Sequence, residues 1–335
     1  MQTYLKSLNQ ALKDLLRNNK DVYLLGEDII DPYGGAFKVT KGLSTDFPNR
    51  VFPTPISEAA IVGIATGMAM RGLKPIIEIM FGDFIMLAAD QIINHAAKFN
   101  KMYSGKVKVP LVIRTPMGGG RGYGPTHSQS LEKFFLGVPG LSVVSPSHFH
   151  NPGNILKYAV LEDNNPVLFI ENKRLYATNL LVKDKFPIKI SNEINSNSYP
   201  IIIARNYEDE KITPDIILIT YGGMSLLIEN IMEKMFNEEI RILAILPSLL
   251  SKFPIKIMKQ IIEGCENVLI IEEGTEGFNW GAEIESLFYE NFGNNYLKIR
   301  RVAAIATVIP AARHLENVVL PSVESIEHTI LEVLS

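Results

Sequence analysis

The chain has 335 residues, a formal net charge of −3 and one cysteine, Cys265. This length exceeds what one hydrophobic core usually organises, so we expect two domains. The near-neutral charge, with no block of lysine and arginine, argues against a nucleic-acid partner, and a single cysteine excludes an internal disulfide framework and indicates a reducing compartment.

The first 18 residues show no apolar stretch followed by a small-residue cleavage site, so they do not resemble a secretory signal. Leucines spaced three and four residues apart predict a helix over 4–19 instead. No apolar run in the chain approaches the ~18 residues that a membrane span requires. We therefore expect no membrane partner and a location in the cytoplasm, or in the matrix of an organelle after import.

Residues 1–190 alternate between short apolar segments and helical patterns. A strand ending at Gly26 precedes a helix over SEAAIVGIATGMAMRG, and a long helix is predicted from Phe84 to Tyr103. Further strands are predicted at KPIIEIM, VPLVIRTP, LSVVSPS and PVLFIEN. This alternation indicates an α/β domain with a mainly parallel sheet.

Residues 191–198, SNEINSNS, are polar and show no period, so we predict a linker here. Beyond it, the apolar segments PDIILITYGG, IRILAILPS and NVLIIEEG alternate with helical patterns. Residues 199–335 are therefore predicted to form a second, smaller α/β domain. Ligands of such open sheets bind at the carboxyl ends of the strands.

The common catalytic signatures are missing from the sequence, which has no G-x-G-x-x-G, Walker A loop, H-E-x-x-H, paired C-x-x-C or G-x-S-x-G. Nicotinamide dehydrogenases, P-loop NTPases, zinc proteases and serine hydrolases therefore lose their support. His148 and His150 form a spaced pair with no acidic or cysteine partner nearby in the sequence. We expect them on the surface rather than as metal ligands.

Five glycines lie between Pro116 and Pro125, directly after a predicted strand, and His127 follows them. Glycine loses more backbone entropy on folding than any other residue, so such a run requires a sharp turn or a close approach. We expect the run to let the chain pass close to a cofactor or substrate while it directs His127 into a cleft. A histidine in a polar, glycine-rich loop is a candidate for a chemical role.

Two further candidates follow strands. Glu58 begins an otherwise apolar helix, where a carboxylate can complement the helix dipole. Alternatively it is a desolvated acid, because burial favours the protonated form, which can donate a hydrogen bond to a ring nitrogen. Phe84, in MFGDF, is either a core residue or a flat face on which a heteroaromatic ring stacks.

Several segments, in order, resemble one protein family. They are LLGEDI, YGGAFKVTKGL, RVFPTPISEAAIVGIATGMAMRGLKPIIEIMFGDF, ADQIINHAAK, VPLVIRTPMGGG, THSQS and DNNPVLFIENKRLY. Together they look like the β subunit of thiamin-diphosphate-dependent 2-oxoacid dehydrogenases, the decarboxylating component of the pyruvate and branched-chain 2-oxoacid dehydrogenase complexes. The resemblance runs from residue 3 to about 178, and the second half resembles the family's transketolase C-terminal-like domain more loosely. It implies an α/β fold in which a pyrimidine-binding domain precedes that second domain.

The resemblance implies roles for the three candidates. Glu58 hydrogen-bonds the aminopyrimidine ring of thiamin diphosphate and selects its imino tautomer, while Phe84 stacks on that ring. His127 holds the substrate or transfers a proton during acyl transfer to lipoamide. The cofactor's thiazolium then serves as the electron sink for loss of carbon dioxide.

The family's β subunits can also hold a potassium ion, largely through main-chain carbonyls. The matching positions are Leu111, Ala159, Val160, Asp163 and Asn165. The helix before DNNP reads one residue longer than is usual in the family, and Asp163 can equally be a turn residue.

The family's diphosphate-binding G-D-G motif is missing from this sequence. The resemblance therefore implies that a separate α subunit supplies the diphosphate and magnesium half of the site. We expect an α2β2 heterotetramer with an obligate, largely apolar interface. The expected reaction is the oxidative decarboxylation of pyruvate or a branched-chain 2-oxoacid, with acyl transfer to lipoamide on a lipoyl acyltransferase core.

Two segments depart from the family pattern. ILPSLLSKFPIK stands where DLRTLxPLD is usual, and SHFHNPGN stands where PxDAKG is usual. These departures suggest specialised surfaces toward a partner or acyltransferase. One alternative is the β subunit of an acetoin dehydrogenase or of an acyloin-type transferase. Another, of a different class, is a non-catalytic scaffold or regulatory subunit, against which the joint presence of Glu58, Phe84 and His127 argues.

Overall fold

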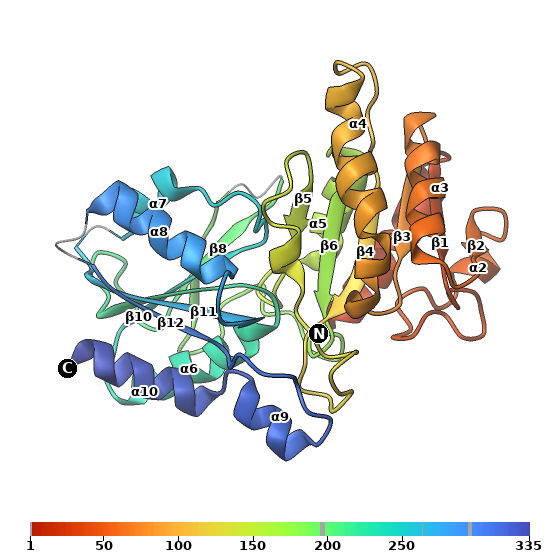
Figure 1. Ribbon diagram of the computed structural model, residues 1–335. Coiled ribbons are helices and arrows are strands. Elements are labelled where there is room, and N and C mark those ends of the chain that lie inside the picture. The colour runs from red at the N-terminus through yellow and green to blue at the C-terminus, as the bar shows by residue number, and fades with distance from the viewer. Residues whose placement is uncertain (1, 195–197, 263, 294–296) are drawn as a thin grey trace.

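The structure, a computed structural model, describes residues 2–194, 198–262, 264–293 and 297–335, and in these residues the chain forms two α/β halves, each built on one six-stranded sheet (Figure 1). The halves lie side by side, and the chain passes from one to the other once. This confirms the predicted α/β class. No helix among the described residues is both long and apolar enough to cross a bilayer.

The N-terminal sheet has the order β2-β1-β3-β4-β6-β5, and all its described pairings are parallel. Its strands are β1 (Val22–Gly26), β2 (Val51–Pro53), β3 (Lys74–Glu78), β4 (Val112–Met117), β5 (Ser142–Val144) and β6 (Val167–Asn172). Helices cover both faces, so the central strands are apolar along most of their length. The sequence pattern detected them for this reason.

The two faces of this sheet carry different helices. One face packs against α1 (Tyr4–Asn18), α2 (Leu43–Asp46) and α5 (Pro152–Leu161). The other packs against α3 (Glu58–Met70), η1 (Gly82–Ala88), η2 (Gln91–Ala96) and α4 (Ala97–Met102). The single long helix predicted over 84–103 is thus wrong in detail, because η1 is a 3₁₀-helix and η2 a π-helix. Apolar periodicity detects helical winding but not the hydrogen-bond spacing that separates these forms.

The C-terminal sheet has the order β12-β11-β9-β10-β8-β7. Its strands are β7 (Lys189–Ile194), β8 (Ile201–Arg205), β9 (Ile216–Thr220), β10 (Ile242–Pro247), β11 (Asn267–Thr275) and β12 (Lys298–Ala304). Four strands are parallel, and β8 pairs antiparallel with both β10 and β7. The helices of this half are η4 (Gly222–Met224), α6 (Ser225–Asn237), α7 (Ile255–Ile261), α8 (Trp280–Phe292), α9 (Arg313–Val319) and α10 (Val323–Leu334), while the short 3₁₀-helix η3 (Glu132–Phe134) lies between β4 and β5 of the N-terminal half.

The predicted linker over 191–198 is wrong for its first half. Strand β7 continues to Ile194 and pairs with β8, while residues 195–197 lie outside the described part of the chain. β7 is an edge strand with a register shift between Ile190 and Asn192. Edge strands are often polar and bulged, which discourages pairing with other chains. Such a strand has no apolar alternation for the sequence to reveal.

One apolar core spans both halves. The α3 face of the N-terminal sheet and the α8 face of the C-terminal sheet contribute to the same buried cluster. Its members include Ile77, Ile113 and Leu168 from the first half, and Ile203, Ile219 and Val268 from the second. This shared core restricts the motion of one half relative to the other. Side chains from the C-terminal half can therefore hold loops of the N-terminal half in place.

A buried ion cluster joins three neighbouring strands of the N-terminal sheet. Arg114 of β4 is 1% exposed. Its guanidinium donates to the Glu171 carboxylate through Nε (2.7 Å) and Nη2 (2.9 Å), and to Glu78 Oε2 through Nη1 (2.8 Å). Tyr176 donates its hydroxyl hydrogen to Glu171 at 2.8 Å. The cluster fixes β3, β4 and β6 near the edge where the candidate site lies.

Candidate active site

The three candidate residues each follow a parallel strand of the N-terminal sheet. Glu58 follows β2, Phe84 follows β3 and His127 follows β4, with β1 between β2 and β3 in the sheet. These are carboxyl ends, so all three regions meet at one edge of the sheet, as ligand sites in open α/β sheets do. We call this edge the ligand edge.

Two carboxylates approach each other at the ligand edge. Glu58 is the first residue of α3, and Glu27 directly follows β1; each is 5% exposed. Burial raises the pKa of Glu27, and the neighbouring Glu58 charge adds to the rise. Sequence reasoning missed Glu27. An acid directly after a buried strand that ends at the ligand edge is the signal that points to it.

The Phe84 and His127 rings are in contact. Their centroids are 5.2 Å apart at an interplanar angle of 80°, and Phe81 approaches His127 at 4.8 Å and 77°. Phe84 is half-buried in η1 and lies against Phe81 as well. The His127 Nδ1 atom is 3.0 Å from Thr126 Oγ1. The structure thus joins two predicted residues in one aromatic cluster, while Glu58 makes no hydrogen bond or ring contact with them among the described residues.

The glycine run approaches the protein itself closely. Gly118, Gly120, Gly122 and Gly124 all have positive φ, between +72° and +94°. A Cβ atom at Gly118 would lie 2.4 Å from Asn172 Nδ2, and one at Gly119 would lie 2.7 Å from Leu320 Cδ1. The run is therefore required for the backbone conformation and for packing against the chain's own side chains. The run does approach other groups closely, here the chain's own side chains, and an approach to a cofactor or substrate stays a prediction.

Charged side chains hold the segment around His127. Lys173, 1% exposed, donates to the His127 carbonyl at 2.6 Å, and the Gln129 side chain donates to Asp83 at 2.8 Å. Burial lowers the pKa of Lys173 to about 8, and the nearby Asp83 and Glu273 carboxylates limit the fall. Neither partner is close to His127 in sequence, so sequence patterns did not indicate them.

The five residues of the predicted potassium site lie in α5, in the turn between α5 and β6, and just before β4. Ala159 and Val160 belong to α5, and the Leu111 carbonyl accepts the Val167 N–H at 2.8 Å. Asp163 Oδ1 accepts the Asn165 backbone N–H at 3.0 Å, which is a turn-forming contact. Its Oδ2 accepts from Ser142 and Tyr199. Potassium binding stays a prediction.

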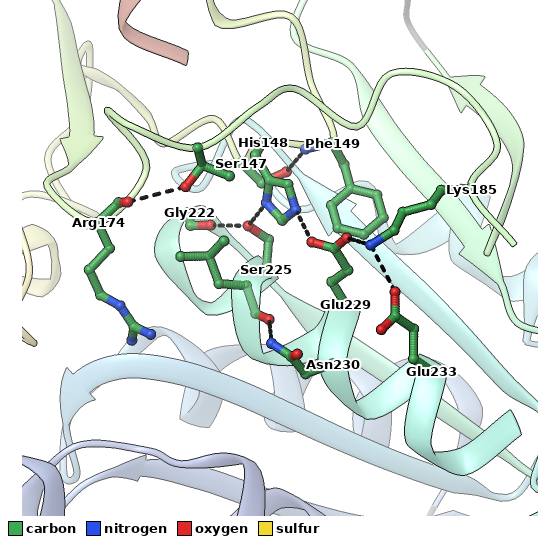
Figure 2. A network of polar contacts seen from close by, with 12 residues as sticks. Ser147, His148, Phe149, Arg174, Lys185, Gly222, Ser225, Glu229, Asn230 and Glu233 are labelled. Atoms are coloured by element: carbon green, nitrogen blue, oxygen red, sulfur yellow. Dashed lines mark hydrogen bonds and ion pairs between the residues drawn. The ribbon is translucent and has the colours of Figure 1, made fainter. Parts of the chain in front are cut away.

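The expectation that His148 and His150 lie on the surface is wrong, because both are 1% exposed. His148 lies between Ser225 and Glu229 of α6, with Nδ1 2.7 Å from Ser225 Oγ and Nε2 2.9 Å from Glu229 Oε2 (Figure 2). Glu229 also pairs with Lys185 at 2.5 Å.

His150 is held through both ring nitrogens. Its Nδ1 is 2.7 Å from Ser147 Oγ, and its Nε2 is 3.3 Å from the Pro200 carbonyl. Burial lowers the pKa of His150 to about 4. The departing segment SHFHNPGN thus joins the two halves. The partners of His148 lie 77 and 81 residues away, beyond any local pattern.

Buried acids lie behind the glycine run. Glu132, Glu272 and Glu273 are each at most 5% exposed. Tyr221 donates to Glu132, and the Gly281 N–H donates to Glu272 at 2.7 Å. Burial raises the pKa of Glu272 to about 8, and the neighbouring Glu132 adds to the rise.

We expect the Glu272→Gln variant to gain stability over the unaltered chain as the pH rises from about 4.5 to about 8. In this window the unfolded state loses a proton that folded Glu272 retains, so the unaltered chain becomes less stable with rising pH. A glutamine does not titrate. The difference in unfolding free energy should grow by up to about 1.4 kcal/mol per pH unit. Urea unfolding of both chains at pH 5, 6.5 and 8 measures this difference, and Glu266→Gln, at an exposed position, is the control. A difference that does not change with pH would contradict the raised pKa of Glu272.

The transketolase pyrimidine-binding domain family matches residues 1–178, and the transketolase C-terminal domain family matches residues 207–326. The chain is 34% identical to the pyruvate dehydrogenase E1 component subunit beta-1, mitochondrial, of Arabidopsis thaliana, over 96% of this chain and 86% of that protein.

Two more relatives match this chain over a similar share of their length. The mitochondrial pyruvate dehydrogenase E1 component subunit beta of Saccharomyces cerevisiae is 34% identical over 99% of this chain and 89% of its own length. The acetoin:2,6-dichlorophenolindophenol oxidoreductase subunit beta of Cupriavidus necator is 32% identical over 96% of this chain and 94% of its own length. A solved structure titled split gene transketolase, inactive beta4 tetramer, shares the fold with a TM-score of 0.74 at 16% identity, over 100% of this chain and 99% of that one.

Proposed function

Because the chain belongs to the family of β subunits of thiamin-diphosphate-dependent 2-oxoacid dehydrogenases, we propose that it supplies the pyrimidine-binding half of a catalytic centre shared with an α subunit. The proposed reaction is the oxidative decarboxylation of pyruvate or a branched-chain 2-oxoacid, with acyl transfer to lipoamide. The observation that carries the proposal is the place of Glu58: this first residue of α3 is 5% exposed at the ligand edge, and its carboxylate oxygens are not among the fully buried unpaired atoms of the described residues, so they stay accessible to an incoming donor.

The residues at the ligand edge fit the aminopyrimidine ring of thiamin diphosphate. The Glu58 carboxylate lies on a largely buried residue while its oxygens remain accessible, so it can hydrogen-bond a group that enters at this edge. A ring nitrogen is a partner of the required kind. Phe84, half-buried, offers a flat face against which such a ring can stack. The neighbouring Glu27 Oε1 has no hydrogen-bond partner among the described residues.

Each residue then has a distinct task. When bound, thiamin diphosphate supplies the thiazolium carbon that adds to the 2-oxo group and takes up the electrons released with carbon dioxide. Glu58 holds a proton at the pyrimidine ring nitrogen. Phe84 orients the ring. His127, whose Nδ1 contacts Thr126, exchanges a proton with the substrate or acyl acceptor through Nε2.

An apolar surface next to Glu58 supports the need for a partner. Ile56, just before α3, is 82% exposed, Ile64 on α3 is 59% exposed and Leu87 on η1 is 65% exposed. Exposed apolar residues gathered beside a site are typical of a surface that another protein covers. In the proposed α2β2 heterotetramer the α subunit covers this surface and brings the diphosphate group with its magnesium ion. An obligate interface of this kind is more apolar than a transient one.

We expect the isolated chain to show no 2-oxoacid turnover, and a mixture with its cognate α subunit, Mg²⁺ and thiamin diphosphate to reduce an artificial electron acceptor. Pyruvate, 3-methyl-2-oxobutanoate and acetoin tested in parallel separate a 2-oxoacid dehydrogenase from the acetoin-cleaving alternative, which the Cupriavidus relative supports. Tight binding of the cofactor with magnesium and turnover by the chain alone would contradict the shared centre. A reconstituted complex that fails to bind the cofactor would favour the non-catalytic scaffold.

A further inference from the structure

The glycine run before His127 is bound by acidic side chains from the C-terminal half. The Gly120 and Gly122 N–H groups donate to Glu316 Oε1 and Oε2, each at 2.8 Å. The Gly119 N–H donates to Glu273 of β11. In Figure 1, α9, which carries Glu316, lies between α10 and the loops of the N-terminal half.

This arrangement is an anion-binding backbone concavity that the protein fills itself. Successive N–H groups in turn conformations, made accessible by glycines of positive φ, attract anions. Both oxygens of one carboxylate are used, and hydrogen bonds to a charged acceptor are about twice as strong as neutral ones. The conformation of the run, and hence the start of the segment that carries His127, depends on Glu316.

Glu316 is one of the two buried residues of α9, the other being the apolar Val319. It is fully buried, while Arg313, His314, Leu315, Asn317 and Val318 are exposed. The apolar contacts around α9 belong to a small separate cluster of Ala304, Ile309, Val319 and Leu320. Because the apolar neighbours of α9 lie outside the three large cores, we expect a change at Glu316 to act mainly on the glycine run, and through its charge on Lys173.

We propose that Glu316 is a positioning residue, which fixes the glycine run from the opposite half of the chain and so places the His127 ring against Phe81 and Phe84. The inference rests on the proposed function only in that His127 acts on the substrate or acyl acceptor. Loss of Glu316 frees the Gly120 and Gly122 N–H groups. The contacts of Glu273 with Gly119 and of Lys173 with the His127 carbonyl remain, so the segment loosens in its middle and stays attached on both sides.

The test uses Glu316→Gln, Glu316→Asp and, as a matched control on the same helix, the exposed Asn317→Ala. A glutamine places an NH₂ donor against one of the two N–H donors. Hydrogen exchange of the 118–130 segment is measured in the chain alone. In Glu316→Gln the exchange rate of this segment should rise about tenfold or more, because each lost charge-assisted hydrogen bond lowers the protection by on the order of a factor of ten. The exchange rate of the α3 segment should stay unchanged. Glu316→Asp keeps the charge, so its exchange rate in the 118–130 segment should lie between those of Glu316→Gln and the unaltered chain.

In the reconstituted complex with the α subunit, Mg²⁺ and thiamin diphosphate, Glu316→Gln should lower kcat about 10- to 100-fold. Cofactor binding should be unchanged, because Glu58 and Phe84 are untouched. Unchanged exchange in 118–130 would overturn the proposal. Faster exchange with full kcat would also overturn it, since His127 would then not depend on the run. If the unaltered chain bound the α subunit and the cofactor but showed no turnover, the proposed function would be contradicted. Faster exchange of residues 118–130 in Glu316→Gln would then still support the role of Glu316 in holding the glycine run.

Discussion

The Arg114→Met variant should lose about 3–5 kcal/mol of unfolding free energy, the cost typical of removing one partner of a buried ion pair. Glu171 and Glu78 are at most 7% exposed, and both rely on the Arg114 guanidinium. Methionine fills a similar volume, so packing accounts for little of the loss. The loss comes from leaving two carboxylates buried without a counter-charge.

Denaturant unfolding of the isolated chain, followed by circular dichroism, measures the effect. Arg241→Met is the matched control, because Arg241 pairs with Asp215 but is 42% exposed, and exposed pairs contribute about 0–1 kcal/mol. Adding Glu78→Gln and Glu171→Gln to Arg114→Met should recover most of the stability, since neutral amides cost less to bury. A loss no larger than that of Arg241→Met would show that the cluster does not depend on the arginine.

The fold was predictable where burial produces a regular pattern of apolar residues along the sequence. Strands β1 and β3 lie between two layers of helix, so their apolar runs stand out, and α1 packs a leucine face that repeats at helical spacing. The edge strand β7 lacks such a pattern, because its pairing with β8 uses backbone groups. The forms of η1 and η2 also depend on backbone geometry that apolar spacing does not encode.

For the candidate site, too, the sequence indicated some residues, and only the folded structure showed the others and their contacts. Glu58, Phe84 and His127 were named from a resemblance, and the contact between Phe84 and His127 came from the folded structure. Glu273 and Glu316 lie 154 and 194–196 residues from the glycines they bind, so no local pattern relates them. His148 was misplaced for the same reason. Its acidic partner exists, but on α6 of the other half.

Replacement of Glu58 by glutamine should lower the rate of 2-oxoacid decarboxylation by the reconstituted complex about 10²–10⁴-fold, the range for loss of a positioned proton-transfer group. Glutamine keeps the shape of the side chain but cannot share a titratable proton with a ring nitrogen. The assay is 2-oxoacid-dependent reduction of an artificial acceptor under saturating cofactor. Asp28→Asn, an exposed acid next to Glu27, is the control and should keep full activity.

The stability of the same variant separates the two interpretations of Glu58. If Glu58 mainly complements the α3 dipole, its replacement should destabilise the isolated chain by about 0.3–1 kcal/mol. If Glu58 is retained for chemistry, the variant should be as stable as the unaltered chain or more stable, because the charge that raises the pKa of buried Glu27 is removed. Thermal unfolding at pH 7 decides between them. We expect lost activity together with unchanged or increased stability, since two adjacent buried carboxylates oppose folding and only a functional requirement accounts for keeping both.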